Sequence, residues 1–147
     1  MQQTLQLQEA ELRHCARIEL NNDSPFPLFR RPGGSHYEAQ FPAVLPANSS
    51  TSILLEAQVG ARVFMGWARY QARDNPGIRL VLTLTKSLLP QQSMLKIQHS
   101  ARLRHEMQVS YCSARRFEAR LSLSEDSLRP DAGKPKSVSL VPGCNAV

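Results

Sequence analysis

The stretch Ile78-Arg79-Leu80-Val81-Leu82-Thr83-Leu84-Thr85-Lys86 alternates between apolar and polar residues. In a β-strand successive side chains point to opposite faces of the sheet. The alternation therefore places Ile78, Leu80, Leu82 and Leu84 on one face, and Arg79, Thr83 and Thr85 on the other together with Val81. Such a pattern is typical of a strand with one face packed on a core.

Two further stretches repeat the pattern. Arg116–Leu123 turns Phe117, Ala119, Leu121 and Leu123 inward. Arg62–Tyr70 has apolar residues on both faces, with Val63, Met65 and Trp67 on one and Phe64, Gly66, Ala68 and Tyr70 on the other, so it predicts a strand that is covered on both sides. Weaker patterns predict strands over Cys15–Leu20, His36–Phe41, Ser52–Ala57, Met94–His99, Gln108–Cys112 and Ser137–Val141.

Turn residues separate these runs, and Asp74-Asn75-Pro76-Gly77 reads as a hairpin loop between two of them. Many short strands with turns every eight to twelve residues predict an all-β fold, an antiparallel β-sandwich over residues 1–147 as a single domain. Gln3–Arg13 contains good helix formers and predicts a short N-terminal helix, although Leu5 and Leu7 also fit a strand. Residues 129–147 are rich in Pro and Gly and predict a loose C-terminal tail with one late edge strand.

The composition indicates a single globular domain without a membrane-spanning helix. The chain has 147 residues, 41% hydrophobic and 20% charged, which suits one domain with its own core. No apolar run approaches the roughly 20 residues that span a bilayer as a helix. The first ten residues lack a basic segment, so no secretory signal is expected. The protein is therefore expected to be cytoplasmic by default or released without a signal.

The charge is strongly basic and unevenly placed. The net charge is +6, and only Lys86, Lys96, Lys134 and Lys136 are lysines, so arginine dominates. Between Arg62 and Arg120 there are 11 basic and 3 acidic residues, a local net of +8, against 7 basic and 9 acidic elsewhere, a net of −2. Such a block suggests an anionic partner, namely a lipid headgroup, nucleic acid or acidic glycan. The alternative is that these arginines are the solvated outer faces of strands.

Several arginines are expected to share faces. Arg116 and Arg120 lie opposite Phe117 and Leu121, Arg102 and Arg104 share a face in the same way, and Arg69 and Arg73 flank Tyr70 near the Asp74–Gly77 loop. If these strands belong to one sheet, their arginines form a continuous cationic surface. Arg116→Glu with Arg120→Glu is then expected to leave folding intact and to weaken partner binding at least tenfold at low salt. Trp67 is either part of this surface or a core residue beside Met65. The candidate ligand-binding residues are Trp67, Arg69, Tyr70, Arg73, Arg102, Arg104, Arg116 and Arg120.

No catalytic motif is present, so the chain is predicted not to be an enzyme and to need no cofactor. His99 and His105, if they share a strand, lie about 20 Å apart, too far to share a metal ion, and no metal site is predicted. The three cysteines fit no zinc or redox spacing, and their odd number argues against a disulfide framework. Cys15 and Cys112 are predicted to be buried and Cys144 to be an exposed thiol. A small hydrolase that uses Cys112 with a histidine stays open as an alternative.

The order of features from Cys15 to His99 resembles a known family. A strand ending in Asn21 leads through Phe41 to Leu45-Pro46-Ala47-Asn48, then to a strand at Ser52–Glu56, to Val63–Tyr70 and to Leu80–Thr85. This order is similar to the central part of the actinoporin-like family, which includes pore-forming cytolysins and fungal lectins. The resemblance covers about 85 of the 147 residues. The chain departs from the cytolysins in having one Trp and three Tyr, where they carry a rich aromatic cluster.

The resemblance implies a two-sheet sandwich without enzymatic activity that binds a phosphocholine headgroup or a sugar. It places Gln3–Arg13 where the cytolysins have a membrane-entering helix, and it points to Trp67 and Tyr70 as binding-face residues. We therefore expect a non-enzymatic β-sandwich that recognises a lipid headgroup, glycan or other anionic partner at a membrane surface through an Arg-rich face. Nucleic acid is less favoured, because no basic-Gly-aromatic-Gly motif occurs. The alternative is a structural or protein-interaction subunit that pairs or oligomerises through a sheet edge.

Overall fold

The computed structural model describes residues 14–33, 37, 40–58, 60–126 and the backbone of 135–142. The predicted N-terminal helix over Gln3–Arg13 lies outside the described residues, as does most of the predicted C-terminal tail, including Cys144. No helix within the described residues has the length and apolar character needed to cross a membrane.

The described residues form ten strands and one short 3-10 turn at Pro90–Gln92. Most of the strands coincide with the segments predicted from alternation and extend them by a few residues. The strands are β1 (Cys15–Asn22), β2 (Leu28–Arg31), β3 (Val44–Leu45), β4 (Ser49–Glu56), β5 (Val63–Ala72), β6 (Arg79–Ser87), β7 (Met94–Ser100), β8 (Leu103–Cys112), β9 (Arg116–Glu125) and β10 (Pro135–Pro142).

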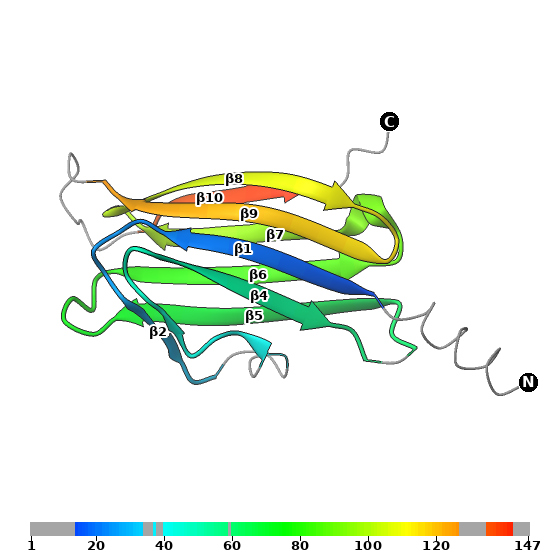
Figure 1. Cartoon of the computed structure of the whole chain (residues 1–147), viewed down its shortest axis with the longest axis horizontal. Helices are drawn as coiled ribbons and strands as arrows, with labels where there is room; N and C mark the ends of the chain where they lie inside the picture. The colour runs from blue at the N-terminus through cyan, green and yellow to red at the C-terminus, as the bar shows by residue number, and fades with distance from the viewer. Residues whose placement is uncertain (1–13, 34–36, 38–39, 59, 127–134, 143–147) are drawn as a thin grey trace, which may run out of the picture.

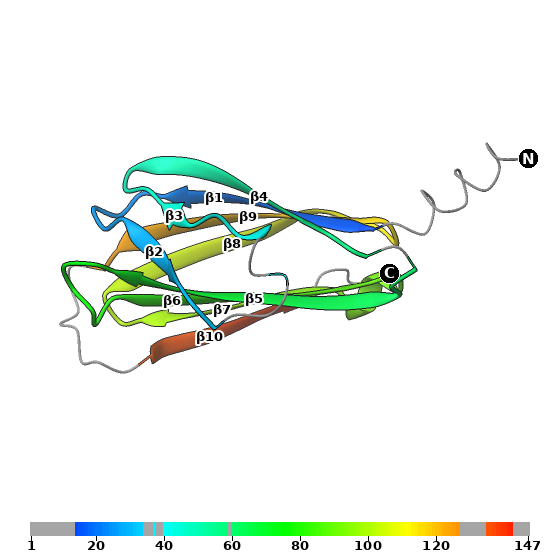
Figure 2. The ribbon, with the colours of Figure 1, turned by 90° about the horizontal axis from the view of Figure 1, so that it is seen from below.

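The strands build two sheets that stack face to face, as Figure 2 shows from the side. One sheet has four strands in the order β4-β1-β9-β8, and the other has six in the order β10-β7-β6-β5-β2-β3 (Figure 1). This arrangement confirms the predicted β-sandwich. All pairings are antiparallel except that of β1 with β9, which is parallel and joins segments about 100 residues apart.

The core lies between the two sheets, and the alternating strands supply it. The residues predicted to face inward on β6 and β9, which are Leu80, Leu82, Leu84, Phe117, Leu121 and Leu123, are all fully buried. Their partners from the other strands include Ile18, Leu20, Ile53, Leu55, Leu95 and Ile97. Because apolar side chains from both sheets meet in one layer, this burial is the main favourable contribution to folding.

Two sequence-based predictions about strands were wrong. Of the predicted strand His36–Phe41, the described residues Tyr37, Gln40 and Phe41 lie in no strand, and the chain instead pairs through β2, which precedes them. β5 is not covered on both sides, because Val63 and Met65 are 56% and 55% exposed. Trp67 shares their outer face, so it is half-buried on the surface of the sheet and is not a core residue.

The short strand β2 is held in place by a buried asparagine. Asn22, at the end of β1, donates through Nδ2 to the carbonyls of Phe26 (2.9 Å) and Leu45 (3.2 Å). Its Oδ1 accepts from the Ser24 hydroxyl at 2.6 Å. These bonds fix the turn by which the chain leaves the four-stranded sheet and enters the six-stranded one. The turn thereby sets where β2 lies against β5.

Candidate functional site

A groove of about 420 Å³ lies on the outer face of the six-stranded sheet, where β2, β5 and β6 run side by side. Three arginines from three different strands line it, namely Arg31, Arg69 and Arg79. Arg31 is directly opposite Arg69 in the β2–β5 pairing, and Arg79 is opposite Gln71 in the β5–β6 pairing. The alternation of each strand turns these side chains outward.

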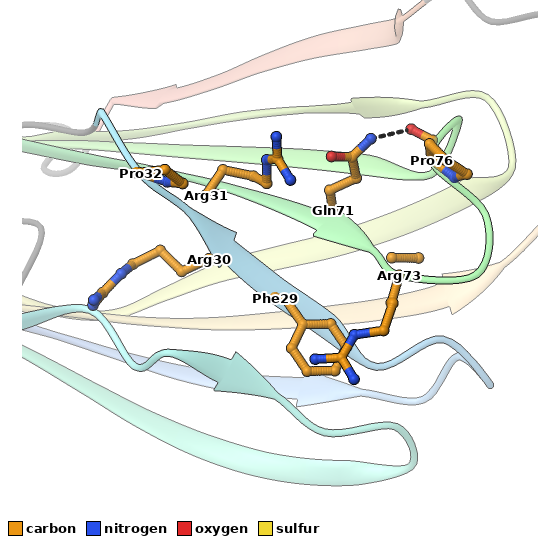
Figure 3. Close-up of a pocket in the computed structure, with 8 residues that line it drawn as sticks. Phe29, Arg30, Arg31, Pro32, Gln71, Arg73 and Pro76 are labelled. Carbon is orange, nitrogen blue, oxygen red and sulfur yellow. Dashed lines mark hydrogen bonds between the residues drawn. The ribbon is translucent and has the colours of Figure 1, made fainter.

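Backbone carbonyls orient two of the three guanidinium groups. Nη2 of Arg69 donates to the Pro32 carbonyl at 2.8 Å, and Nε of Arg79 donates to the Pro76 carbonyl at 3.2 Å. Pro76 also accepts from Nε2 of Gln71 at 2.7 Å, the bond drawn in Figure 3. The β5–β6 hairpin loop thus positions both Arg79 and Gln71 beside the groove.

A second hollow, of about 440 Å³, continues the groove toward the start of β2. The Arg73 guanidinium lies 4.3 Å from the centre of the Phe29 ring, a cation–π contact visible in Figure 3. Arg30, the residue between Phe29 and Arg31, points away from both and donates to the carbonyl of Phe41. Arg73 therefore extends the cationic lining, whereas Arg30 serves the structure.

Exposed apolar side chains follow the arginines along β5. Val63 and Met65 are more than half exposed, and Trp67 lies between them and Arg69, whose guanidinium is 5.7 Å from the Trp67 ring. One strand therefore presents an apolar end and a cationic end on the same face. We call the outward-facing described residues of β2, β5, β6 and β7 the basic sheet face.

The basic sheet face contains cations but no carboxylate among its described residues. Its charged side chains are Arg31, Arg69, Arg79 and Lys96. Asp74 lies beyond it, exposed in the β5–β6 loop. A surface with charge of one sign attracts oppositely charged partners over several ångströms.

The outer face of the four-stranded sheet is balanced in charge. Its described charged residues are Arg17, Glu19, Glu56, Arg104, Glu106, Arg116, Glu118 and Arg120, four of each sign. Arg116 pairs with Glu118 at 3.4 Å and lies over the Tyr111 ring at 4.2 Å. In the strand registers Glu19 lies beside Arg120, and Glu118 beside Arg17.

The expected continuous cationic surface does not form, because its strands belong to different sheets. Trp67 and Arg69 lie on β5 in the six-stranded sheet, and Arg73 follows β5, whereas Arg104, Arg116 and Arg120 lie on the opposite side of the sandwich. Arg102, in the turn between β7 and β8, is 3.2 Å from the carboxylate of Glu125 and 5.6 Å from the Phe26 ring. The eight candidate residues therefore do not meet in one place.

Tyr70 points into the core and not toward a ligand. It is 1% exposed, and its hydroxyl donates to the Pro42 carbonyl at 2.7 Å. The neighbouring positions of β5 explain this placement, since even-numbered residues from Phe64 to Ala72 face inward. Tyr70 touches the groove only from beneath.

Arg31, Arg79 and Phe29 were not among the candidate residues predicted from the sequence. Arg79 was visible on the polar face of its strand, and that position was the available signal. Arg31 stood in a Pro-Gly-rich stretch that resembled a turn, and its neighbour Arg69 is 38 positions away in the sequence. Only the pairing of β2 with β5 brings the two together.

The histidine pair is closer than predicted. His99 lies on β7 and His105 on β8, so the two do not share a strand, and His99 Nε2 lies 2.6 Å from His105 Nδ1. The predicted separation of about 20 Å was therefore wrong. The described residues still contain no group of three or more His, Cys, Asp or Glu side chains that could hold a metal ion.

The residues of the hydrolase alternative do not come together. Cys112 is at the far end of β8 from His105, seven residues away, which is about 23 Å along a strand. Cys112 is moreover disulfide-bonded, contrary to the expectation from the odd cysteine count, whereas Cys15 is a free thiol. A sulfur in a disulfide is not a thiolate nucleophile.

Comparisons with known proteins match the fold but not the sequence. No family model and no curated protein sequence matches the chain. Among solved structures it is similar to the lipid binding protein Nakanori, with a TM-score of 0.59 and 11% identity over 84% of this chain and 80% of that one. It is also similar to the RahU protein, solved in complex with a TRIS molecule, with a TM-score of 0.50 and 11% identity over 78% of this chain and 96% of that one. At such identities the likeness extends to the fold alone.

Proposed function

We propose that this protein is a non-enzymatic, lipid-binding β-sandwich that docks on the anionic surface of a membrane through its basic sheet face. The observation that carries the proposal is the charge of that face, which has four cations and no carboxylate among its described residues. The similarity to Nakanori, a lipid binding protein, supports it, because the two proteins share a fold. A relationship to actinoporin-like proteins is part of the same proposal.

The layout of the face suits a lipid surface. Arginine and lysine side chains near an anionic membrane each contribute about 1 kcal/mol of attraction. Val63 and Met65 supply apolar area that can enter the headgroup region, and Trp67 lies next to them, as amphipathic rings commonly do at such interfaces. Docking would bury exposed apolar surface and pair the arginines with anionic headgroups in one step.

The test is co-sedimentation with vesicles of phosphatidylcholine alone or with phosphatidylserine, at low and at physiological salt. Arg31→Gln with Lys96→Gln removes two charges from the basic sheet face, at side chains for which no described contact is lost. Two charges at about 1 kcal/mol each correspond to a roughly 30-fold loss of affinity for the anionic vesicles. The matched control is Arg17→Gln with Arg115→Gln, which lowers the net charge equally but lies elsewhere.

Equal losses in the two double variants would contradict the choice of face, and absence of binding to any anionic vesicle would contradict the function. The alternative, a subunit that pairs through a sheet edge, has its own support in the long strands β4 and β8, which form the two edges of the four-stranded sheet. Self-association that resists salt, without vesicle binding, would favour this alternative.

A further inference from the structure

We propose that the groove between β2 and the β5–β6 hairpin is a binding site for a phosphate group, held by the guanidinium groups of Arg31, Arg69 and Arg79. The inference rests on the proposed function, because it names the chemical group that the basic sheet face would recognise. It goes beyond general attraction to an anionic surface, since it predicts one saturable site at a defined place.

The three arginines lie close enough together for their positive charges to repel one another. Directly opposed residues of neighbouring strands have Cβ atoms about 4.5–5.5 Å apart, and like charges at directly opposed positions are destabilising. Diagonal neighbours lie about 7–8 Å apart, still within reach of long side chains. Arg31 is directly opposite Arg69, and Arg79 is diagonal to Arg69 across β5 and β6. No carboxylate among the described residues pairs with any of the three. An anion in the groove would remove this repulsion.

The groove is organised before a ligand arrives. Arg69 and Arg79 each donate one N–H to a backbone carbonyl, of Pro32 and Pro76 respectively, and a guanidinium has five N–H donors in all. The carbonyl contacts fix the orientation of the side chains and leave donors for a ligand. Less side-chain entropy is then lost on binding than with mobile arginines.

A glycine permits the position of Arg69. Gly33 has a φ of +94°, and a Cβ placed there would lie 2.8 Å from Nη2 of Arg69. A larger residue would therefore push the guanidinium away from the Pro32 carbonyl. Glycine at position 33 therefore suits both the turn that follows β2 and the present place of the Arg69 guanidinium.

The number of donors favours phosphate over carboxylate. A carboxylate has two oxygens, which one guanidinium fork satisfies. A terminal phosphate has three strong acceptor oxygens and a charge of about −1.5 to −2 near neutral pH. Three guanidinium groups from three strands match that charge and that number of acceptors. Free phosphate and a phosphate-bearing lipid headgroup present the same chemistry, so the experiment needs arms that separate them.

The first arm is a titration with inorganic phosphate at constant ionic strength, followed by the NMR signals of the arginine Nε–H groups. We expect saturable shifts at Arg69 and Arg79. Arg79→Gln should weaken the apparent affinity at least tenfold, whereas the matched control Arg17→Gln, on the other sheet, should leave it unchanged. Shifts that do not saturate, or an equal loss in both variants, would overturn the site.

The second arm identifies the source of the phosphate. Vesicles of digalactosyl diacylglycerol, which lack phosphate, carry either phosphatidic acid or oleic acid at equal surface potential. For the wild type we expect at least a tenfold preference for the phosphatidic acid vesicles, and we expect inorganic phosphate to compete with this binding. The Arg79→Gln variant should lose the preference but should still bind the oleic acid vesicles. Equal binding to both vesicles would refute a headgroup phosphate site while the proposed function stands. Saturable inorganic phosphate binding without any vesicle binding would refute the proposed function and leave a site for free phosphate.

Discussion

Lys86 is a charged residue in an apolar layer. It continues the inward face of β6 after Leu84 and is 0% exposed. Its Nζ donates to the carbonyls of Ser87 (2.6 Å) and Ala114 (2.9 Å), and the second of these belongs to the turn between β8 and β9. The side chain therefore ties the two sheets together at one end of the sandwich. Burial lowers the pKa of Lys86 from 10.5 to about 8, and the nearby Cys15 opposes this shift.

Lys86 makes stability depend on pH in the alkaline range. Between about pH 8 and 10.5 the unfolded state binds more protons at this residue than the folded state, so the free energy of unfolding rises as pH rises through that window. Below about pH 8 the penalty for burying the charge is complete. We expect urea unfolding from pH 7.5 to 10.5 to show this gain in the wild type and not in Lys86→Met.

Ionisable groups near Lys86 also titrate, so the pH dependence of the unfolding free energy is compared as the difference between the wild type and Lys86→Met. Burial raises the pKa of the Cys15 thiol, and burial together with Lys86 lowers the pKa of His14. Cys15 opposes the gain above about pH 9, because its thiol holds a proton longer in the folded state. Subtracting the Lys86→Met curve removes most of this contribution. Parallel curves for the two proteins would contradict the role assigned to Lys86.

Substitution of Tyr70 tests whether this side chain contributes to stability or to binding. Tyr70→Phe removes the hydroxyl that donates to Pro42 and leaves that partly buried carbonyl without this partner. We expect a loss of about 0.5–1.5 kcal/mol in the free energy of unfolding, with vesicle affinity unchanged. Chemical denaturation and co-sedimentation of the same variant measure both quantities. A reduced vesicle affinity at an unchanged free energy of unfolding would instead show that Tyr70 contributes to binding.

At the scale of elements, β6 is the strand on which the six-stranded sheet depends most clearly. It pairs with β5 on one side and β7 on the other, and every inward residue from Leu80 to Lys86 is fully buried. In its middle, Leu82 lies beside Ala68 and Ile97. A cavity at this position would have fixed strands on both sides and little freedom to collapse.

Leu82→Ala should therefore cost roughly 2–5 kcal/mol of unfolding free energy, the usual range for a buried leucine. Thr83→Ala is the matched control, because Thr83 is the next residue along the strand and faces outward. Its cost should stay near the roughly 0.5 kcal/mol or less typical of surface changes. Equal costs for the two variants, measured by denaturant unfolding, would mean that the assigned faces of β6 are wrong.

The elements differ in how far alternation could predict them. β5, β6 and β9 each carry nine or ten residues with an unbroken inward face, so their burial pattern follows from the sequence. β2 has only four residues between Pro27 and Pro32, too few for a period to show. Its place is set by Asn22, Ser24 and the pairing with β5, which are contacts that no local pattern contains.

At the scale of the whole molecule, the sandwich divides the basic block between two surfaces. Arg69, Arg79 and Lys96 lie on the six-stranded sheet, and Arg104, Arg116 and Arg120 on the four-stranded one, interleaved there with glutamates. Attraction to an anionic surface depends on the net charge facing it within about a Debye length of 8–10 Å. The two faces should therefore behave differently toward the same vesicle.

Arg116→Glu with Arg120→Glu tests this difference directly. A continuous cationic surface would predict at least a tenfold loss of binding at low salt, whereas the balanced charge of that face leads us to expect less than a threefold change at the same salt concentration. The measurement is vesicle affinity of the folded double variant beside that of Arg31→Gln with Lys96→Gln. A tenfold loss in the former and none in the latter would place the binding surface on the four-stranded sheet.

The class of fold and the inner face of most strands could be predicted from alternation alone, because a period of two is a local property that each segment carries on its own. The sequence also determined that the middle of the chain is basic. It did not determine which arginines are neighbours, since that depends on which sheet each strand joins. The meeting of Arg31 with Arg69, the salt bridge of Arg102 with Glu125 and the contact of His99 with His105 all arise from pairing between segments or across the sandwich. Only the tertiary structure decides such contacts, because they are fixed by packing of the common core and not by the spacing of residues along the chain.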